Sequence, residues 1–157
     1  MSLRIDAASP TPLVELTEIA DLPGLEGRAL PKRTRLFAKL ESVHPSGSIK
    51  DRSVRSILET AVKRRLIRGR RVLDSSSGNA GVAYAAIGAQ LGLPVTLVIP
   101  GNASLERLER IRAHGAELIL TDPVEGYDFA VHTARRLAEE EPDRYWYADQ
   151  YGSDANW

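Results

Sequence analysis

The sequence predicts an α/β protein, a three-layer sandwich in which helices cover both faces of a mostly parallel sheet. Helix-like and strand-like segments alternate from about residue 50 onward, which is typical of parallel strands joined by crossover helices. The β-branched run 95–99 suits a strand that is covered on both faces. Residues 78–92 are apolar on nearly every side and rich in alanine, which indicates a buried helix.

The remaining helices are predicted from apolar residues at helical spacing, with charged residues on the opposite face. They span residues 51–67, 104–114 and about 125–141. Gly115 and Pro142 come directly after the second and third of these segments, and both residue types commonly end helices.

Short strands are expected between the helices. After residue 50 they lie at 70–74, 95–99, 117–120 and 145–148. Before residue 50 the pattern predicts a strand at 13–16, a Pro- and Gly-rich loop at 22–31 and a strand at 35–41.

The composition argues against several classes of function. The 157 residues suffice for one domain with a sizeable core, and 43% apolar and 27% charged residues are close to the averages of folded proteins. Lys plus Arg and Asp plus Glu both total 21, so the charge balance does not favour nucleic acid or an anionic membrane as partner. There is no cysteine and the three histidines show no metal-ligand spacing, so neither disulfides nor a metal site is expected. No stretch has the length of a membrane span and the start has no secretory pattern, so the expected location is the cytoplasm.

Aromatic residues are concentrated near the C-terminus. Five of the nine fall in the last thirteen positions, namely Tyr145, Trp146, Tyr147, Tyr151 and Trp157. Large rings stabilise a protein by filling a core. Either this segment docks back on the domain, or the polypeptide stops part-way through a larger fold.

Residues 44–52, His-Pro-Ser-Gly-Ser-Ile-Lys-Asp-Arg, predict a tight turn that leads into a helix. Lys50 then lies in or beside the first helical turn, where the helix dipole disfavours a cation and favours the neutral, nucleophilic amine. Schiff-base chemistry requires such an amine. The alternative is a solvated lysine at a helix start. A serine–lysine hydrolase motif fails, because it needs serine three residues before the lysine and this chain has Gly47.

Residues 75–81, Ser-Ser-Ser-Gly-Asn-Ala-Gly, lie between a predicted strand and the apolar helix. Small residues there let backbone N–H groups and hydroxyls converge at a helix N-terminus, which is a ready site for a carboxylate or phosphate. Asn79 either caps the helix or bonds to a ligand. The glycine spacing of the dinucleotide fingerprint and the Gly-Lys-Ser/Thr of a Walker loop are both missing.

Together the two segments resemble those of the fold-type II pyridoxal-phosphate enzymes, and within that group the cysteine synthase and cystathionine β-synthase branch. Residues 45–52 resemble the segment of the lysine that binds the cofactor, and residues 76–81 resemble the loop that holds the substrate α-carboxylate. Further similarity covers nearly the whole chain, at residues 11–14, 104–107, 115–117, 149–151 and 155–156. The resemblance implies the N-terminal portion of the tryptophan synthase β-like fold, with pyridoxal 5'-phosphate as cofactor.

The resemblance also implies a role for each residue of the expected site. Lys50 binds the cofactor and acts as the catalytic base, and Asn79 bonds to the 3'-oxygen of the cofactor. The substrate carboxylate is held by Gln150 and by the loop residues Ser76, Ser77, Gly78, Asn79 and Ala80. The family usually has threonine where this chain has Ala80, so one hydroxyl to the carboxylate is missing.

The implied domain organisation has three parts. Residues 1–41 are the N-terminal segment that in the family packs on a second domain, residues 42–145 form the small α/β domain, and residues 146–157 begin the crossing to the second domain. The phosphate-binding loop of the family belongs to that second domain. The 157 residues alone are therefore expected to be a weak catalyst or none.

The implied activity is β-replacement on an O-activated serine by a sulfur donor, as in cysteine biosynthesis. The Lys-Asp-Arg form argues for β-replacement rather than for the dehydratase branch. A homodimer is the implied assembly. The alternative is a non-catalytic truncated homologue or isolated domain that acts as a binding or assembly module. A third interpretation, a receiver- or flavodoxin-like ligand binder, leaves the lysine turn without a role.

Overall fold

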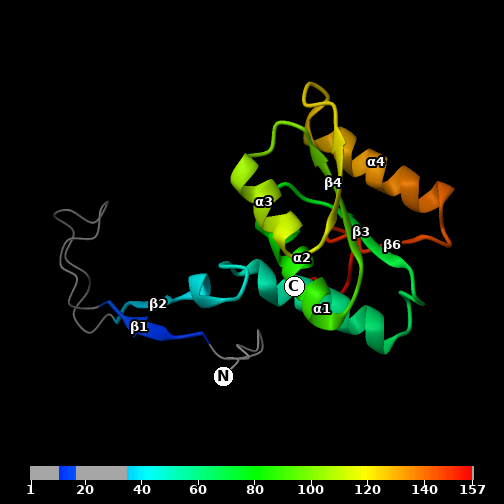
Figure 1. The fold of residues 1–157 in the computed structure, drawn as a ribbon. Coiled ribbons are helices and arrows are strands. Elements are labelled where there is room, and N and C mark those ends of the chain that lie inside the picture. The colour runs from blue at the N-terminus through cyan, green and yellow to red at the C-terminus, as the bar shows by residue number, and fades with distance from the viewer. Residues whose placement is uncertain (1–10, 17–34, 157) are drawn as a thin grey trace.

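A computed structural model describes residues 11–16 and 35–156 (Figure 1). The chain forms a four-stranded sheet in the order β5-β4-β3-β6 and a two-stranded sheet of β1 and β2. The strands are β1 (Leu13–Glu15), β2 (Phe37–Lys39), β3 (Arg71–Ser75), β4 (Val95–Pro100), β5 (Glu117–Thr121) and β6 (Tyr145–Tyr147). The α-helices are α1 (Lys50–Lys63), α2 (Asn79–Leu91), α3 (Leu105–Ala113) and α4 (Gly126–Glu140).

The elements form the three layers that the sequence predicts. Helices α1, α2 and α3 lie on one face of the four-stranded sheet, and α4 covers the other (Figure 1). All neighbouring strands of this sheet run parallel, because a crossover helix joins each strand to the next along the chain. The predicted fold class is confirmed.

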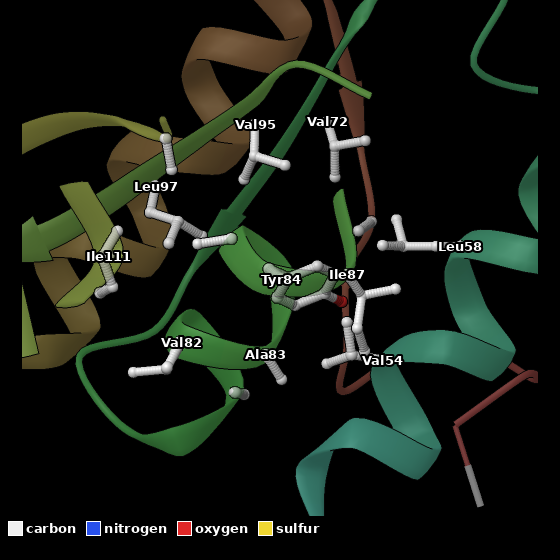
Figure 2. Close-up of a cluster of buried hydrophobic side chains, with 14 of the residues drawn as sticks. Val54, Leu58, Val72, Val82, Ala83, Tyr84, Ile87, Val95, Leu97 and Ile111 are labelled. Atoms are coloured by element: carbon white, nitrogen blue, oxygen red, sulfur yellow. The ribbon is translucent and has the colours of Figure 1, made fainter. Parts of the chain in front are cut away.

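Two hydrophobic clusters fill the space on either side of the sheet. In the larger one, the ring of Tyr84 lies among side chains from α1, α2 and the strands (Figure 2). Helix α2 packs closely on β4 at Gly88. A Cβ atom at this position would lie only 2.3 Å from Cγ2 of Val95. The smaller cluster packs α4 on the other face and consists of Leu73, Val98, Ala130, Ala134 and Tyr145.

Helix α1 ends earlier than the sequence predicts. The prediction extended to residue 67, but the helix ends at Lys63. Arg65 adopts a left-handed φ of 56°, and the N–H of Leu66 reaches back to the carbonyl of Ala61. This is the hydrogen-bond pattern of a Schellman motif, which usually has glycine at the left-handed position. Arginine at that position gives no comparable sequence signal.

The N-terminal elements also differ in length from the prediction. Strand β2 occupies only 37–39 of the expected 35–41, and a 3-10 turn, η1 (Glu41–Val43), follows it. The loop predicted at 22–31 and the aromatic Trp157 lie outside the described residues. The division of the chain at residues 41 and 145 remains a prediction.

Three of the C-terminal aromatic residues dock on the domain. Tyr145 is buried and Tyr147 packs beside it in the smaller cluster, whereas Trp146 packs on the larger cluster across the sheet. This alternation is the ordinary consequence of side chains pointing to opposite faces of a strand. Tyr151, beyond β6, is 74% exposed. The docking interpretation therefore holds for β6.

The described part of the chain contains no helix that is long and apolar enough to cross a membrane. Within residues 11–16 and 35–156, no group of three or more acidic or histidine side chains could hold a metal ion.

Candidate active site

A cavity of about 300 Å³ lies where β3 meets α2. Its lining includes every site residue predicted from the sequence and two further tyrosines: Lys50, Ser76, Ser77, Gly78, Asn79, Ala80, Tyr127, Gln150 and Tyr151. These residues come from α1, from the loop before α2 and its first turn, from α4 and from the segment after β6. Parallel α/β sheets bind ligands at the carboxyl ends of their strands, and the volume is in the range of small-molecule sites.

Lys50 is the first residue of α1, and its side chain lines the cavity. Its predicted place in the first helical turn is confirmed. The amine forms no ion pair and no hydrogen bond with any residue that the structure describes. A lysine without a carboxylate partner at a cavity wall is available for a ligand.

The turn before Lys50 is held by a buried carboxylate. Asp51 is fully buried and accepts hydrogen bonds from the backbone N–H of Ser46, at 3.0 Å, and from its hydroxyl. Burial raises the pKa of Asp51. From α3, Arg110 donates to the Ser46 carbonyl at 3.0 Å, and Gly47 supplies the φ of 81° that the turn requires. The position of Lys50 thus depends on contacts to two helices.

A second carboxylate joins this turn to the N-terminal residues. Glu41 accepts hydrogen bonds from the hydroxyl of Thr11, the ring of His44 and the guanidinium of Arg52, each at 2.8 Å. The hydrogen bonds from Arg52 are the main reason that the pKa of Glu41 is lowered to about 2. Glu41 therefore stays ionised and connects the segment before β1 to helix α1.

The N-terminus of α2 presents unpaired backbone donors. The hydroxyl oxygen of Ser76 accepts the N–H groups of Gly78, at 3.4 Å, and Gly81, at 3.0 Å. At this helix start, the backbone N–H groups of Ser77, Asn79 and Ala80 have no acceptor among the described residues. Unpaired N–H groups at a helix start attract a carboxylate or phosphate.

The structure separates the roles of the loop residues. Ser76 is buried, and its hydroxyl oxygen accepts backbone N–H groups of the same loop. This is a structural role that the sequence did not predict. The interpretation of Asn79 as a helix cap is wrong, because Gly78 is the N-cap residue and no side chain caps it. The Asn79 amide is exposed and has no partner within the described ranges, so it is available to a ligand. Ala80 lacks a hydroxyl but contributes its N–H. Binding of substrate or cofactor by these residues remains a prediction.

Gln150 follows β6 and is anchored to β3. Its backbone N–H donates to Oδ2 of Asp74 at 3.2 Å, and its Nε2 donates to the carbonyl of Ser75 at 3.4 Å. Asp74 is 2% exposed, and burial raises its pKa to about 6. The hydroxyl of Tyr127 donates to the same Ser75 carbonyl at 2.7 Å.

Sequence reasoning missed Tyr127 and Tyr151. Tyr127 belongs to α4, on the opposite face of the sheet from α1 and α2, so no local pattern connects it to the loop. Tyr151 directly follows Gln150 in the stretch 149–151 that resembles the family, and this position was its signal.

Comparison with known proteins identifies the family. The family described as "Pyridoxal-phosphate dependent enzyme" matches residues 5–157. The chain belongs to this family. The fold-type II resemblance seen in the lysine turn and the loop is thereby confirmed.

Relatives within the pyridoxal-phosphate dependent enzymes include several cysteine synthases. The chain is 49% identical over 129 residues to the cysteine synthase of Aquifex aeolicus, covering 82% of this chain and 39% of that protein. It is 33% identical over 147 residues to cysteine synthase A of Escherichia coli, covering 93% and 42%. The chain thus spans about two fifths of the length of these relatives.

Solved structures of related enzymes superpose well on this chain. A cysteine synthase from Entamoeba histolytica superposes with a TM-score of 0.83 at 36% identity, covering 94% of this chain and 42% of that one. An O-acetylserine dependent cystathionine β-synthase from Helicobacter pylori has a TM-score of 0.78 at 28% identity, covering 95% and 46%.

The donors of the cavity suit one end of the family's cofactor. Pyridoxal phosphate carries an aldehyde that reacts with a primary amine, and beside it a ring oxygen that accepts hydrogen bonds. Lys50 offers the amine and Asn79 offers an amide N–H, and neither has another partner in the described part of the chain. Their chemistry therefore fits this end of the cofactor, and the predicted binding by Lys50 and Asn79 stays a prediction.

Proposed function

We propose that these residues belong to a cysteine synthase-like enzyme, which replaces the β-substituent of an O-activated serine by a sulfur donor. The observation that carries the proposal is that one cavity gathers a helix N-terminus with a lysine and an amide that have no partner in the described part of the chain. The similarity to cysteine synthases supports it.

In this proposal the loop before α2 binds the substrate carboxylate. The free N–H groups of Ser77, Asn79 and Ala80 suit a carboxylate, and the helix dipole adds to their attraction. One N–H of the Gln150 amide is available to the same group. Together they orient the substrate, with its Cα toward Lys50.

Lys50 moves the proton. When bound, pyridoxal phosphate supplies an electron sink for the electron pair of the Cα–H bond. The Lys50 amine takes the proton from Cα and returns it after the new bond has formed. Between these steps the bond from Cβ to the leaving oxygen breaks, and a bond from Cβ to sulfur forms.

The finer parts of the proposal concern partners and location. We include a homodimer, a cytoplasmic location and the packing of residues 1–41 on a second domain. Exposed apolar side chains of β1 and β2 support that packing, with Leu13 62% and Phe37 42% exposed. The same surface favours the second candidate function, a non-catalytic assembly module.

The test is visible absorption of the purified chain after addition of pyridoxal phosphate. We expect a band that is lost in Lys50→Ala and kept in Lys63→Ala, an exposed lysine at the other end of α1. Borohydride reduction followed by peptide mapping is expected to locate the adduct on Lys50. A β-substituted serine is expected to shift the band.

Two results would count against the proposal. A band that survives Lys50→Ala would show reaction with other lysines. No band at all would count against a cofactor site in the 157 residues alone, and the active-site interpretation would then apply only to a longer parent protein.

A further inference from the structure

The carbonyl oxygen of Ser75, at the end of β3, is shared by two side chains. Tyr127 donates to it at 2.7 Å and Gln150 donates through Nε2 at 3.4 Å. A carbonyl oxygen only accepts, so both side chains must turn hydrogens toward it. The first distance is that of an ordinary O–H···O bond, whereas the second is at the long limit for an N–H···O bond.

The two side chains form hydrogen bonds of unequal strength with the Ser75 oxygen. The Tyr127 hydroxyl keeps its proton, because burial and then its neighbour Tyr151 raise the pKa of Tyr127. Tyr127 therefore holds the stronger bond, and the amide of Gln150 is bound weakly. The backbone of Gln150 is fixed separately, by the bond from its N–H to Asp74.

Both side chains also line the cavity. The side-chain amide of Gln150 carries two N–H groups. Because the Ser75 oxygen only accepts, the end of the amide that faces it must be the nitrogen. The second N–H is free among the residues that the structure describes. A weakly held amide can turn this hydrogen to a ligand at little cost.

We propose that Tyr127 is a positioning residue, which occupies the Ser75 carbonyl and so keeps the amide of Gln150 available to the carboxylate of an amino-acid ligand. The identity of that ligand rests on the function proposed above. Without the tyrosine hydroxyl, the oxygen of Ser75 has one donor left. The bond from Gln150 then shortens, and the amide is drawn from the cavity toward the strand.

The first experiment needs neither cofactor nor ligand. Tyr127→Phe removes the hydroxyl and keeps the ring. Hydrogen exchange of the Gln150 side-chain amide is measured by NMR on the ¹⁵N-labelled chain, with the signal assigned by its loss in Gln150→Glu. Exchange is expected to slow severalfold in Tyr127→Phe. It is expected to be unchanged in Tyr145→Phe, a buried tyrosine of β6 outside the cavity.

The second experiment compares L-serine with L-serine methyl ester by NMR titration. Affinity for the acid is expected to fall roughly ten- to a hundredfold in Tyr127→Phe, the range of one hydrogen bond to a charged group. Affinity for the ester is expected to stay the same. In Gln150→Ala, adding Tyr127→Phe is expected to cause no further loss, whereas a purely structural effect would add to it.

Unchanged or faster amide exchange in Tyr127→Phe would overturn the inference, as would additive losses in the double variant. Slower exchange without any preference of the wild-type chain for the acid would support the role of Tyr127 and contradict the proposed function. The two proposals therefore fail separately.

Discussion

Ser46 bonds to the carboxylate of Asp51 through both its backbone N–H and its hydroxyl, and these bonds close the turn that precedes Lys50. Both residues are buried, so a carboxylate oxygen that loses its donor has no water to replace it. The turn and the lysine are therefore expected to respond together to changes at this pair.

Ser46→Ala removes one of the two donors to Asp51. We expect the free energy of unfolding to fall by about 1–3 kcal/mol, the cost of a buried polar group that loses its partner. We also expect a slower reaction of Lys50 with pyridoxal phosphate. Urea unfolding and the rate of appearance of the visible band measure the two effects. Ser104→Ala, at an exposed helix start without a side-chain cap, is the control; equal effects in both variants would contradict the prediction.

Glu41→Gln tests the link between Thr11 and α1. The pKa of Glu41 is lowered to about 2 from 4.5, so its ionised form stabilises the fold above pH 4.5. This stabilisation is lost as the pH falls through about 2. In Glu41→Gln we expect the free energy of unfolding, measured in urea, to fall less steeply as the pH is lowered. We also expect faster hydrogen exchange in β1 and β2. Glu59→Gln, in a surface ion pair, is expected to show neither change.

Asp74 gives a pH dependence of opposite sign. Its folded-state pKa of about 6 exceeds its ordinary 3.8, so the folded chain holds a proton that the unfolded chain releases. The contribution of Asp74 to the free energy of unfolding is largest below pH 4 and falls as the pH rises to about 6, by an amount on the order of 3 kcal/mol. Asp74→Asn is expected to remove this slope in urea unfolding from pH 4 to 7. A slope that persists would assign it to another group.

Gly81→Ala probes the close approach of α2 to its own loop. A Cβ atom there would lie 2.3 Å from the carbonyl oxygen of Ser76, so the loop backbone must shift. We expect a stability loss of about 1–3 kcal/mol together with weaker binding of pyridoxal phosphate. Gly92→Ala, at the far end of α2 with a φ of 68° and open space around it, is expected to lose stability without losing binding. Normal binding in Gly81→Ala would mean that the loop tolerates displacement.

Features with a local cause could be predicted from the sequence. Lys50 and the loop at 76–80 depend on turn-forming residues next to a helix, and the structure brings both to one cavity. The apolar helix at 78–92 and the β-branched strand at 95–99 could also be predicted, because an element that is buried on all sides has few polar positions.

Features with a distant cause could not be predicted. The bond from Tyr127 to Ser75 exists only because α4 crosses the sheet to the opposite face, which depends on the order of the strands. The early end of α1 depends on a left-handed arginine, Arg65. The structural role of Ser76 depends on a hydroxyl oxygen that accepts an N–H five residues later, at Gly81.

Strand β6 is the last strand of its sheet along the chain, yet it borders the first, β3, with Tyr145 opposite Arg71. A nascent chain that has released α4 but not β6 can already assemble the other three strands and their helices. At that stage β3 is an outer strand with unpaired backbone groups on one side, which is the usual template for aggregation. Gln150 and Tyr151 have not yet arrived, so the cavity has no far wall. Closure of the predicted site and protection of β3 therefore depend on the same step of synthesis, the release of β6 and the segment that follows it.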